Sequence, residues 1–292
     1  MARAGLGMAR YAGASIFAIA TSKKALWREK YDMCLIVFDW RPGSDTPLRL
    51  AANRDEIHAR PTQALGAWPD DPTLVGGRDL RAGGTWLAAS QTGRIAAVTN
   101  VRDAHATAPS SPPSRGALPY QALTHEAPIA WLETLAASEA QVYDWFNLLY
   151  CDGVTLVHVH HGPAGTTLTR VSPGVHGLSN ATLDTPWPKV IRARDGFKHA
   201  LEQSSWQAPA LDTMHDTRSA PTPDLPDTGV GMEMERFLSP IFIRGDRYGT
   251  RTTTLVEWQP TSIELYESRF GPNGAAHGSR QHSLALAGVA QG

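Results

Sequence analysis

The segment Cys34-Leu-Ile-Val-Phe-Asp-Trp40 is an apolar run that ends at Arg41-Pro42-Gly43. A run of this length before a Pro-Gly pair is typical of a buried strand followed by a turn. Residues 48–53, directly after Pro47, predict a second strand. Only a short loop separates the two segments, so we expect them to pair as a hairpin that begins at Cys34.

Further segments predict strands, and most of them lie in pairs joined by short turns. Gln91-Thr92-Gly93 and Asp152-Gly153 are Gly-containing turns of the kind that close antiparallel hairpins. The predicted strands cover residues 84–90, 94–99, 147–151, 154–160, 166–171, 252–258 and 263–270.

Two segments show the apolar spacing of helices, residues 129–146 and, more clearly, residues 187–201. Residues 108–116 and 204–231 are rich in Pro, Ser and Thr, and we expect loops there. No alternation of strand and helix suggests a parallel sheet. Two packed antiparallel sheets flanked by helices, an α+β architecture, fit this inventory, and a sandwich without helices is the competing arrangement. The apolar stripe of the second helix contains Trp187, Val190, Ile191, Phe197 and Leu201.

We divide the chain into an N-terminal extension (1–32), one domain (33–270) and a loosely ordered tail (271–292) with a weak helix-like patch at residues 284–289. The extension contains the basic residues Arg3, Arg10, Lys23 and Lys24, no acidic residue before Glu29 and a short apolar stretch. A start codon placed too far upstream is the favoured interpretation, and a removed leader is the second.

The composition restricts the classes of partner. The chain has 292 residues, 42% hydrophobic and 19% charged, with a net charge of −1. This balance predicts no general attraction to nucleic acid or to an anionic membrane. No apolar run approaches the roughly 20 residues of a membrane-spanning helix. Two cysteines make no disulfide framework, so we expect a reducing compartment and a cytoplasmic location.

The predicted second strand continues into four polar residues, Asn53-Arg54-Asp55-Glu56. Charged groups at the end of a buried strand need partners, so they tend to be site residues or turn caps. Further polar motifs follow along the chain. In order they are Arg60-Pro61-Thr62, Gly76-Gly77-Arg78-Asp79, Gly83-Gly84-Thr85-Trp86-Leu87, Val98-Thr99-Asn100, Arg115-Gly116, Gly177-Leu178-Ser179-Asn180 and Tyr248-Gly249-Thr250-Arg251-Thr252.

From Met33-Cys34 onward, this ordered set resembles the NRDE family, which includes the eukaryotic transport and Golgi organisation protein two. The resemblance covers about residues 33–270. That family in turn resembles N-terminal-nucleophile hydrolases of the choloylglycine hydrolase and penicillin acylase kind. The resemblance implies a four-layer αββα fold and a cysteine hydrolase that cleaves an amide or thioester.

The resemblance also implies roles for individual residues. Cys34 resembles the nucleophile, which a preceding cleavage exposes as the first residue. Its own α-amine, with a pKa near ~8, can take the proton of a thiol whose pKa is near ~8.5. Asp55 resembles the aspartate that holds this amine, and Arg251 the arginine that steadies the thiolate. Asn100 and Asn180 resemble the donors to the oxyanion.

This chain departs from the hydrolase pattern at two places. Thirty-three residues precede Cys34, so the chain as written has an amide there and no free amine. The catalytic interpretation therefore requires a start at Met33 or removal of the leader. The hydrolases also carry an arginine in the region where this chain has Ala51-Ala52.

Structural interpretations compete with these roles. Cys34 could be a buried strand cysteine, Asn53 and Glu56 could hold a loop, and Gly83-Gly84 favours a tight turn over a phosphate cradle. Asn180 could form a turn, and Arg251 a sheet-face ion pair.

A binding protein on the same fold is the alternative function. Family members have been linked to haem movement and to lipid metabolism, so haem or lipid is the cargo that the resemblance implies, and a small-molecule substrate is the catalytic counterpart. We expect no required cofactor. His158 and His160 share one face of a predicted strand, but no carboxylate or cysteine lies nearby in sequence, so we expect a solvated strand end and no metal site.

Overall fold

The computed structural model describes residues 33–106 and 109–287. The predicted N-terminal extension, residues 1–32, lies outside the described residues.

The described residues form two antiparallel sheets. The first has six strands in the order β10-β1-β2-β11-β12-β13, and the second has seven strands, β3 to β9, in sequence order. The strands of the first sheet are β1 (Met33–Trp40), β2 (Leu48–Ile57), β10 (Gly174–Leu178), β11 (Tyr248–Trp258), β12 (Ser262–Phe270) and β13 (Ala276–Ala285). Those of the second are β3 (Thr62–Ala67), β4 (Leu74–Asp79), β5 (Leu87–Ser90), β6 (Arg94–Asn100), β7 (Phe146–Cys151), β8 (Leu156–Gly162) and β9 (Gly165–Arg170).

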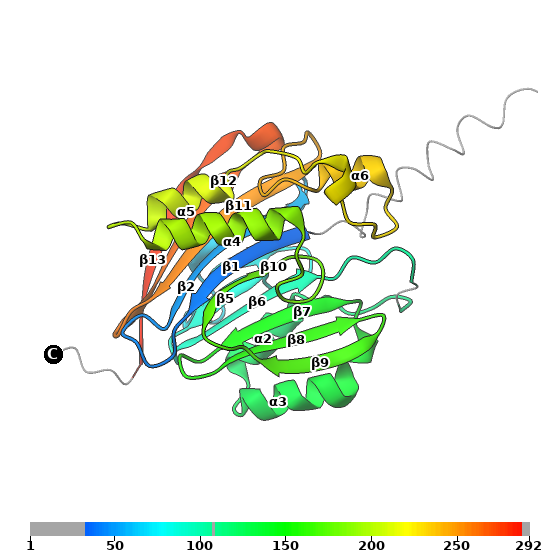
Figure 1. Ribbon diagram of the computed structural model, residues 1–292. Coiled ribbons are helices and arrows are strands. Elements are labelled where there is room, and N and C mark those ends of the chain that lie inside the picture. Colours follow the sequence, from blue (N-terminus) through cyan, green and yellow to red (C-terminus); the bar gives the residue numbers. More distant parts are fainter. Residues whose placement is uncertain (1–32, 107–108, 288–292) are drawn as a thin grey trace, which may run out of the picture. The chain divides into compact units, whose positions relative to one another are not determined.

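Helices cover the outer face of each sheet. Helices α4 (Pro188–Leu201) and α5 (Gln207–Met214) pack on the first sheet, and α2 (Ala117–Thr124) and α3 (Pro128–Thr134) pack on the second (Figure 1). A separate apolar cluster joins the inner faces of the two sheets. This order of layers is the αββα sandwich that the sequence predicts.

Strand β1 contributes to two of these clusters, which explains its continuous apolar run. Successive side chains of a strand point to opposite faces. Ile36 and Phe38 face the second sheet, whereas Leu35 and Val37 face α4 and α5. Because both faces are buried, the run shows no apolar–polar alternation.

Strand β2 is longer than the sequence predicts. It continues past Asn53, the end of the predicted strand, through Arg54, Asp55 and Glu56 to Ile57, so the charged residues of the Asn53-Arg54-Asp55-Glu56 motif belong to the strand. All four are buried. Strand β11 pairs with β2 along this whole stretch, from Glu257↔Arg49 to Tyr248↔Ile57. This pairing stabilises the extended conformation of β2 beyond its apolar residues.

Several other predictions need correction. The tail is not loose at residues 276–285, where β13 pairs along β12. Residues 204–231 are not one long loop, since they contain α5 and a short 3₁₀ turn, η3 (Thr222–Asp224). Residues 129–146 leave the α-helical form after Thr134 and pass through a π turn, η1 (Leu135–Glu139), and a 3₁₀ turn, η2 (Ala140–Val142). Ile191 lies outside the buried stripe of α4, with 40% of its surface exposed.

Strands β3, β4 and β10 and helix α2 do not appear among the elements predicted from the sequence. The strands are short and rich in glycine, a residue depleted in strands generally. The remaining short helices are α6 (Met232–Phe237) and the 3₁₀ turn η4 (Pro272–Gly274). Among the described residues, no helix has the length and apolar character needed to cross a bilayer.

Candidate active site around Cys34

Cys34 is the second residue of β1 and is half-buried. It pairs with Arg54 of β2, and its thiol is not in a disulfide. The hydroxyl of Ser179, just after β10, lies 3.1 Å from the carbonyl oxygen of Cys34 and can donate to it. Strands β2 and β10, the two neighbours of β1, therefore both approach this cysteine.

Asp55 lies on β2 opposite Met33, one position from Cys34 in the register. Its side chain is 1% exposed. The Thr250 hydroxyl donates to Oδ1 at 2.6 Å, whereas Oδ2 is buried and accepts no hydrogen bond from the described residues. Burial raises the pKa of Asp55 to about 6, against the opposing effects of the Lys189 charge and the Thr250 hydrogen bond.

Lys189 is a site residue that the sequence analysis does not identify. It lies in the first turn of α4, is 3% exposed and donates from Nζ to the carbonyl oxygen of Leu238 at 3.2 Å. Burial lowers its pKa to about 8, while the charges of Asp55 and Cys34 act in the opposite direction. The signal was its position, because Lys189 precedes Ala193 and Phe197 by four and eight residues, on the buried side of the helix.

Asn180 connects the end of β10 to the end of β6. Its amide Nδ2 donates to the carbonyl oxygen of Asn100 at 2.9 Å, and its Oδ1 lies 3.0 Å from the Ser179 hydroxyl. The Ser179 hydroxyl has one proton, so at any time it donates either to Asn180 Oδ1 or to the carbonyl oxygen of Cys34. The structure thus brings Asn100, Asn180 and Cys34 into one connected group, and their roles toward an oxyanion stay a prediction.

Asn147 of β7 holds the segment that carries Asn180. Its Nδ2 lies within 2.9–3.3 Å of the carbonyl oxygens of Ser179 and Ala181 and within 3.0 Å of Thr99 Oγ1. Its Oδ1 accepts from His158 Nε2 at 3.0 Å and His160 Nδ1 at 2.8 Å.

These contacts correct the expectation of a solvated strand end at His158. His158 is 3% exposed, and burial lowers its pKa to about 3, so the ring is neutral at physiological pH. Across residues 33–106 and 109–287, no group of three or more His, Cys, Asp or Glu side chains has the arrangement of a metal site.

Arg54, Glu56 and Arg251 form a second charged group beside Cys34. Arg54 stacks 4.3 Å above the ring of Trp86 and lies 3.5 Å from the Glu56 carboxylate. Arg251 donates to Thr62 Oγ1 at 3.1 Å and to the carbonyl oxygen of Arg60. Burial and the charge of Arg54 lower the pKa of Arg251 to about 10. The effect of Arg251 on a Cys34 thiolate stays a prediction.

Asn53 has a structural position. Its Nδ2 donates to the carbonyl oxygens of Met214 (2.8 Å) and Ile241 (2.9 Å), and its Oδ1 accepts from Thr253. It therefore joins β2 to the end of α5 on the helix-covered face.

The Gly84-Thr85-Trp86 motif is also held by packing. The Thr85 hydroxyl donates to the Gly77 carbonyl at 2.7 Å, and the Thr85 amide donates to Gly116 at 3.0 Å. A Cβ on Gly77 would lie 2.1 Å from the Trp86 ring. The glycines let the chain and the Trp86 side chain approach closely.

Gly84→Ala should destabilise the protein by about 1–3 kcal/mol, the usual cost of overpacking. A Cβ at residue 84 would lie 2.3 Å from the backbone of Gly116, which cannot rotate away. Urea unfolding measures the effect. Gly66→Ala is the matched control, since its nearest neighbour would be 4.0 Å away. Equal stability of the two variants would refute this account.

Comparisons with known proteins test the family resemblance. A family model described as Transport and Golgi organisation 2 matches residues 33–271. The mouse Transport and Golgi organization 2 homolog is 32% identical over 251 residues, with 77% of this chain and 88% of the relative covered. The human homolog is 33% identical over 245 residues, with the same shares covered.

Two solved structures have similar folds at 8% sequence identity each. One is a mutant of conjugated bile acid hydrolase from Clostridium perfringens, with a TM-score of 0.47, covering 88% of this chain and 100% of the other. The second is a Caenorhabditis elegans N-acylethanolamine-hydrolyzing acid amidase ortholog, with a TM-score of 0.40, covering 67% and 95%. The sequence matches decide the family, and they confirm the resemblance predicted from the motifs: the chain belongs to the Transport and Golgi organisation 2 family.

Proposed function

We propose that this protein is a cysteine N-terminal-nucleophile hydrolase of an amide or thioester, with Cys34 as the nucleophile. The observation that carries the proposal is the buried Asp55 carboxylate beside the start of β1, whose Oδ2 accepts no hydrogen bond from the described part of the chain. A buried carboxylate oxygen without a donor is costly. An ammonium on Cys34, once the preceding residues are removed, would supply that donor.

The reaction follows from this arrangement. The α-amine of Cys34 takes the thiol proton, and the thiolate attacks the carbonyl carbon. The C–N or C–S bond then breaks, and the ammonium returns its proton to the leaving amine or thiol. Water hydrolyses the acyl-cysteine thioester, which releases a carboxylic acid and restores the thiol. Asn100 and Asn180 are the proposed donors to the oxyanion, and Asp55 holds the amine.

Lys189 supports the same proposal. It is a buried cation whose charge interacts with both Asp55 and Cys34. A positive charge near a thiol favours the thiolate, which is the reactive form.

The geometry favours hydrolysis over carriage of haem. His158 and His160 both donate to Asn147, and His158 is buried. These imidazoles are therefore engaged within the protein and would have to leave Asn147 to bind iron.

A chain that begins at Cys34 should form a covalent acyl adduct with 4-nitrophenyl acetate, visible by intact-mass spectrometry as one acetyl group. Cys34→Ala should form none, because the nucleophile is absent. Cys151→Ala is the matched control and should react normally, since Cys151 is 2% exposed and burial raises the pKa of its thiol to about 12.

Intact mass of the protein from its native source provides the second test. We expect a mature chain that begins at Cys34. A native chain that retains residues ahead of Cys34, or an adduct that survives Cys34→Ala, would overturn the proposal.

A further inference from the structure

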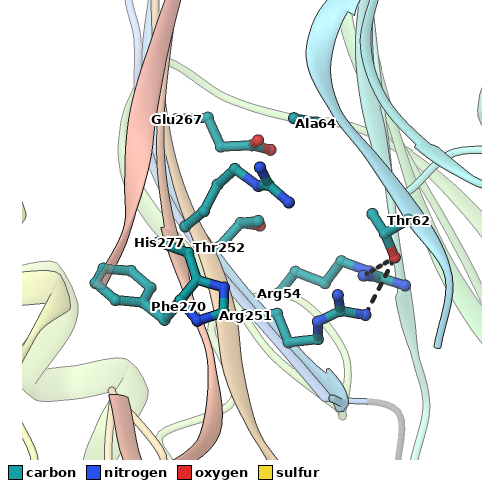
Figure 2. A pocket seen from close by; sticks show the side chains of 9 residues that line it. Arg54, Thr62, Ala64, Arg251, Thr252, Glu267, Phe270 and His277 are labelled. Atoms are coloured by element: carbon teal, nitrogen blue, oxygen red, sulfur yellow. Dashed lines mark hydrogen bonds between the residues drawn. The ribbon is translucent and has the colours of Figure 1, made fainter. Parts of the chain in front are cut away.

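A small cavity lies between the first sheet and β3, one strand from Cys34. Its polar lining comes chiefly from Arg54, Arg251, Thr252, Glu267 and Arg269. The volume of the cavity is about 30 Å³. Figure 2 shows Arg54 and Arg251 side by side, both hydrogen-bonded to Thr62, with Thr252 and Glu267 facing the same space.

The cavity is aligned with Cys34 by strand register. Cys34 pairs with Arg54, Arg54 with Thr252, and Thr252 with Arg269, so these residues form one row across β1, β2, β11 and β12. Directly opposed side chains in such a row lie on the same face. Adjacent strands are about 4.8 Å apart, which places Thr252 about 10 Å from Cys34 along the row.

The charges in the cavity are unbalanced. Among the residues that line the cavity, three guanidinium groups face one carboxylate, that of Glu267, which accepts a hydrogen bond from the Leu65 amide at 3.0 Å. The Glu56 carboxylate lies outside this lining, 3.5 Å from Arg54. Burial raises the pKa of Glu267, against the opposing effects of the Leu65 hydrogen bond and the neighbouring arginine charges. Burial and the charges of Arg54 and Arg269 lower the pKa of Arg251, whereas the charges of Glu56 and Asp79 act in the opposite direction.

The cavity also contains a buried hydroxyl that makes no hydrogen bond to the described part of the chain. Thr252 is 4% exposed, and its Oγ1 makes no hydrogen bond within the described ranges. A buried polar atom of this kind in a native structure calls for an explanation, and a role in ligand binding is one. An oxyanion fits, because it accepts hydrogen bonds from both hydroxyl and guanidinium groups.

We infer that this cavity binds a small oxyanion, a carboxylate or a phosphate group, through Arg54, Arg251, Arg269 and the hydroxyl of Thr252. Binding of an oxyanion in this cavity does not depend on the proposed function. The further statement that the oxyanion is part of the substrate rests on the proposed function. In that setting, the substrate of Cys34 carries an anionic group about 10 Å from the carbonyl that is attacked. The cavity thereby selects anionic over neutral amides or thioesters.

Titration calorimetry at constant ionic strength tests the binding itself, with inorganic phosphate in one arm and acetate in the other. We expect saturable binding of at least one anion. Arg269→Gln should weaken it about tenfold, the loss expected for one charge-assisted hydrogen bond. Arg170→Gln is the matched control, since Arg170 is exposed on β9 in the other sheet and its replacement removes the same charge.

Thr252→Val provides a second variant that is expected to fold. The hydroxyl it removes has no hydrogen-bond partner among residues 33–106 and 109–287, so the unfolding midpoint should not fall, while anion binding should weaken.

Absence of saturable binding of both anions to the wild type would overturn the inference. Equal weakening by Arg170→Gln and Arg269→Gln would also overturn it, because the effect would then be one of surface charge. The calorimetry measures binding without turnover. If Cys34 is not acylated, the proposed function fails, but the anion-binding result can still be interpreted. A positive result in only one arm identifies the oxyanion as phosphate or as carboxylate.

Discussion

Replacement of Lys189 by methionine should lower the free energy of unfolding by roughly 1–2 kcal/mol at pH 7, because Asp55 loses the neighbouring positive charge and must take up a proton about one pH unit above its folded-state pKa, at ~1.36 kcal/mol per unit. Lys189 and Asp55 are 3% and 1% exposed, and each charge offsets the cost of burying the other. Methionine fills most of the lysine volume, so the loss reports on charge more than on packing. Urea unfolding measures it.

The loss of stability caused by Lys189→Met should become smaller as the pH falls. The folded-state pKa of Asp55 is raised from 3.8 to about 6, so its protonation favours the folded state and its ionisation opposes it. Without Lys189 the ionised form loses its counter-charge, which raises this pKa further. The cost of Lys189→Met should therefore be larger at pH 7 than at pH 6 and should disappear as the pH falls toward 5.

Lys198→Met is the matched control for this experiment. Lys198 lies in the same helix but is exposed, so its replacement should change stability by less than about 0.5 kcal/mol. A pH-independent loss in Lys189→Met would contradict the role of Asp55, and no loss would contradict the buried pair.

Asn147→Leu should cost at least about 3 kcal/mol, because several buried polar groups lose their partner and each such loss costs ~1–3 kcal/mol. The groups are the carbonyl oxygens of Ser179 and Ala181 and the rings of His158 and His160. Leucine has a similar volume and no polar atoms, so the loss isolates the hydrogen bonds. Urea unfolding followed by fluorescence measures the effect.

The same substitution should impair the proposed chemistry. Asn147 holds the segment with Asn180, and removal of one oxyanion donor typically slows a hydrolase about 10²–10³-fold. The acylation rate of a chain that begins at Cys34 reports this. Thr167→Val on exposed β9 serves as the control. Unchanged acylation in a folded Asn147→Leu variant would show that Asn147 does not position Asn180 for the reaction.

Local features of the sequence are sufficient for part of the fold. Residues 34–40 predict β1 because an apolar run buried on both faces needs no information from elsewhere in the chain. Asp152-Gly153 predicts a tight turn because Gly153 adopts φ of +82°, which favours glycine. The stripe from Val190 to Phe197 predicts α4. The order of the polar motifs predicts the family and names Cys34, Asp55, Asn100, Asn180 and Arg251.

The interactions that hold the site depend on residues far apart in the chain. Asp55 meets Thr250 across 195 residues, and Asn53 bonds to Met214 and Ile241 from 161 and 188 residues away. Hydrogen bonds to these distant partners satisfy polar side chains of β2, which continues through Arg54, Asp55 and Glu56, three residues beyond the end of the strand predicted from the sequence. The mostly exposed β13 forms by pairing with β12 and has little apolar pattern to predict it.

The sequence by itself thus determined the family, the layered α+β architecture and the candidate nucleophile, since these follow from motif order and local burial patterns. Tertiary structure decided which polar groups lie beside Cys34. Lys189 joins Asp55 only because α4 packs over the first sheet, and Arg54, Thr252 and Arg269 form one row only because β2, β11 and β12 pair in register. Burial and charge pairing are properties of the assembled layers, and no local segment of the sequence contains them.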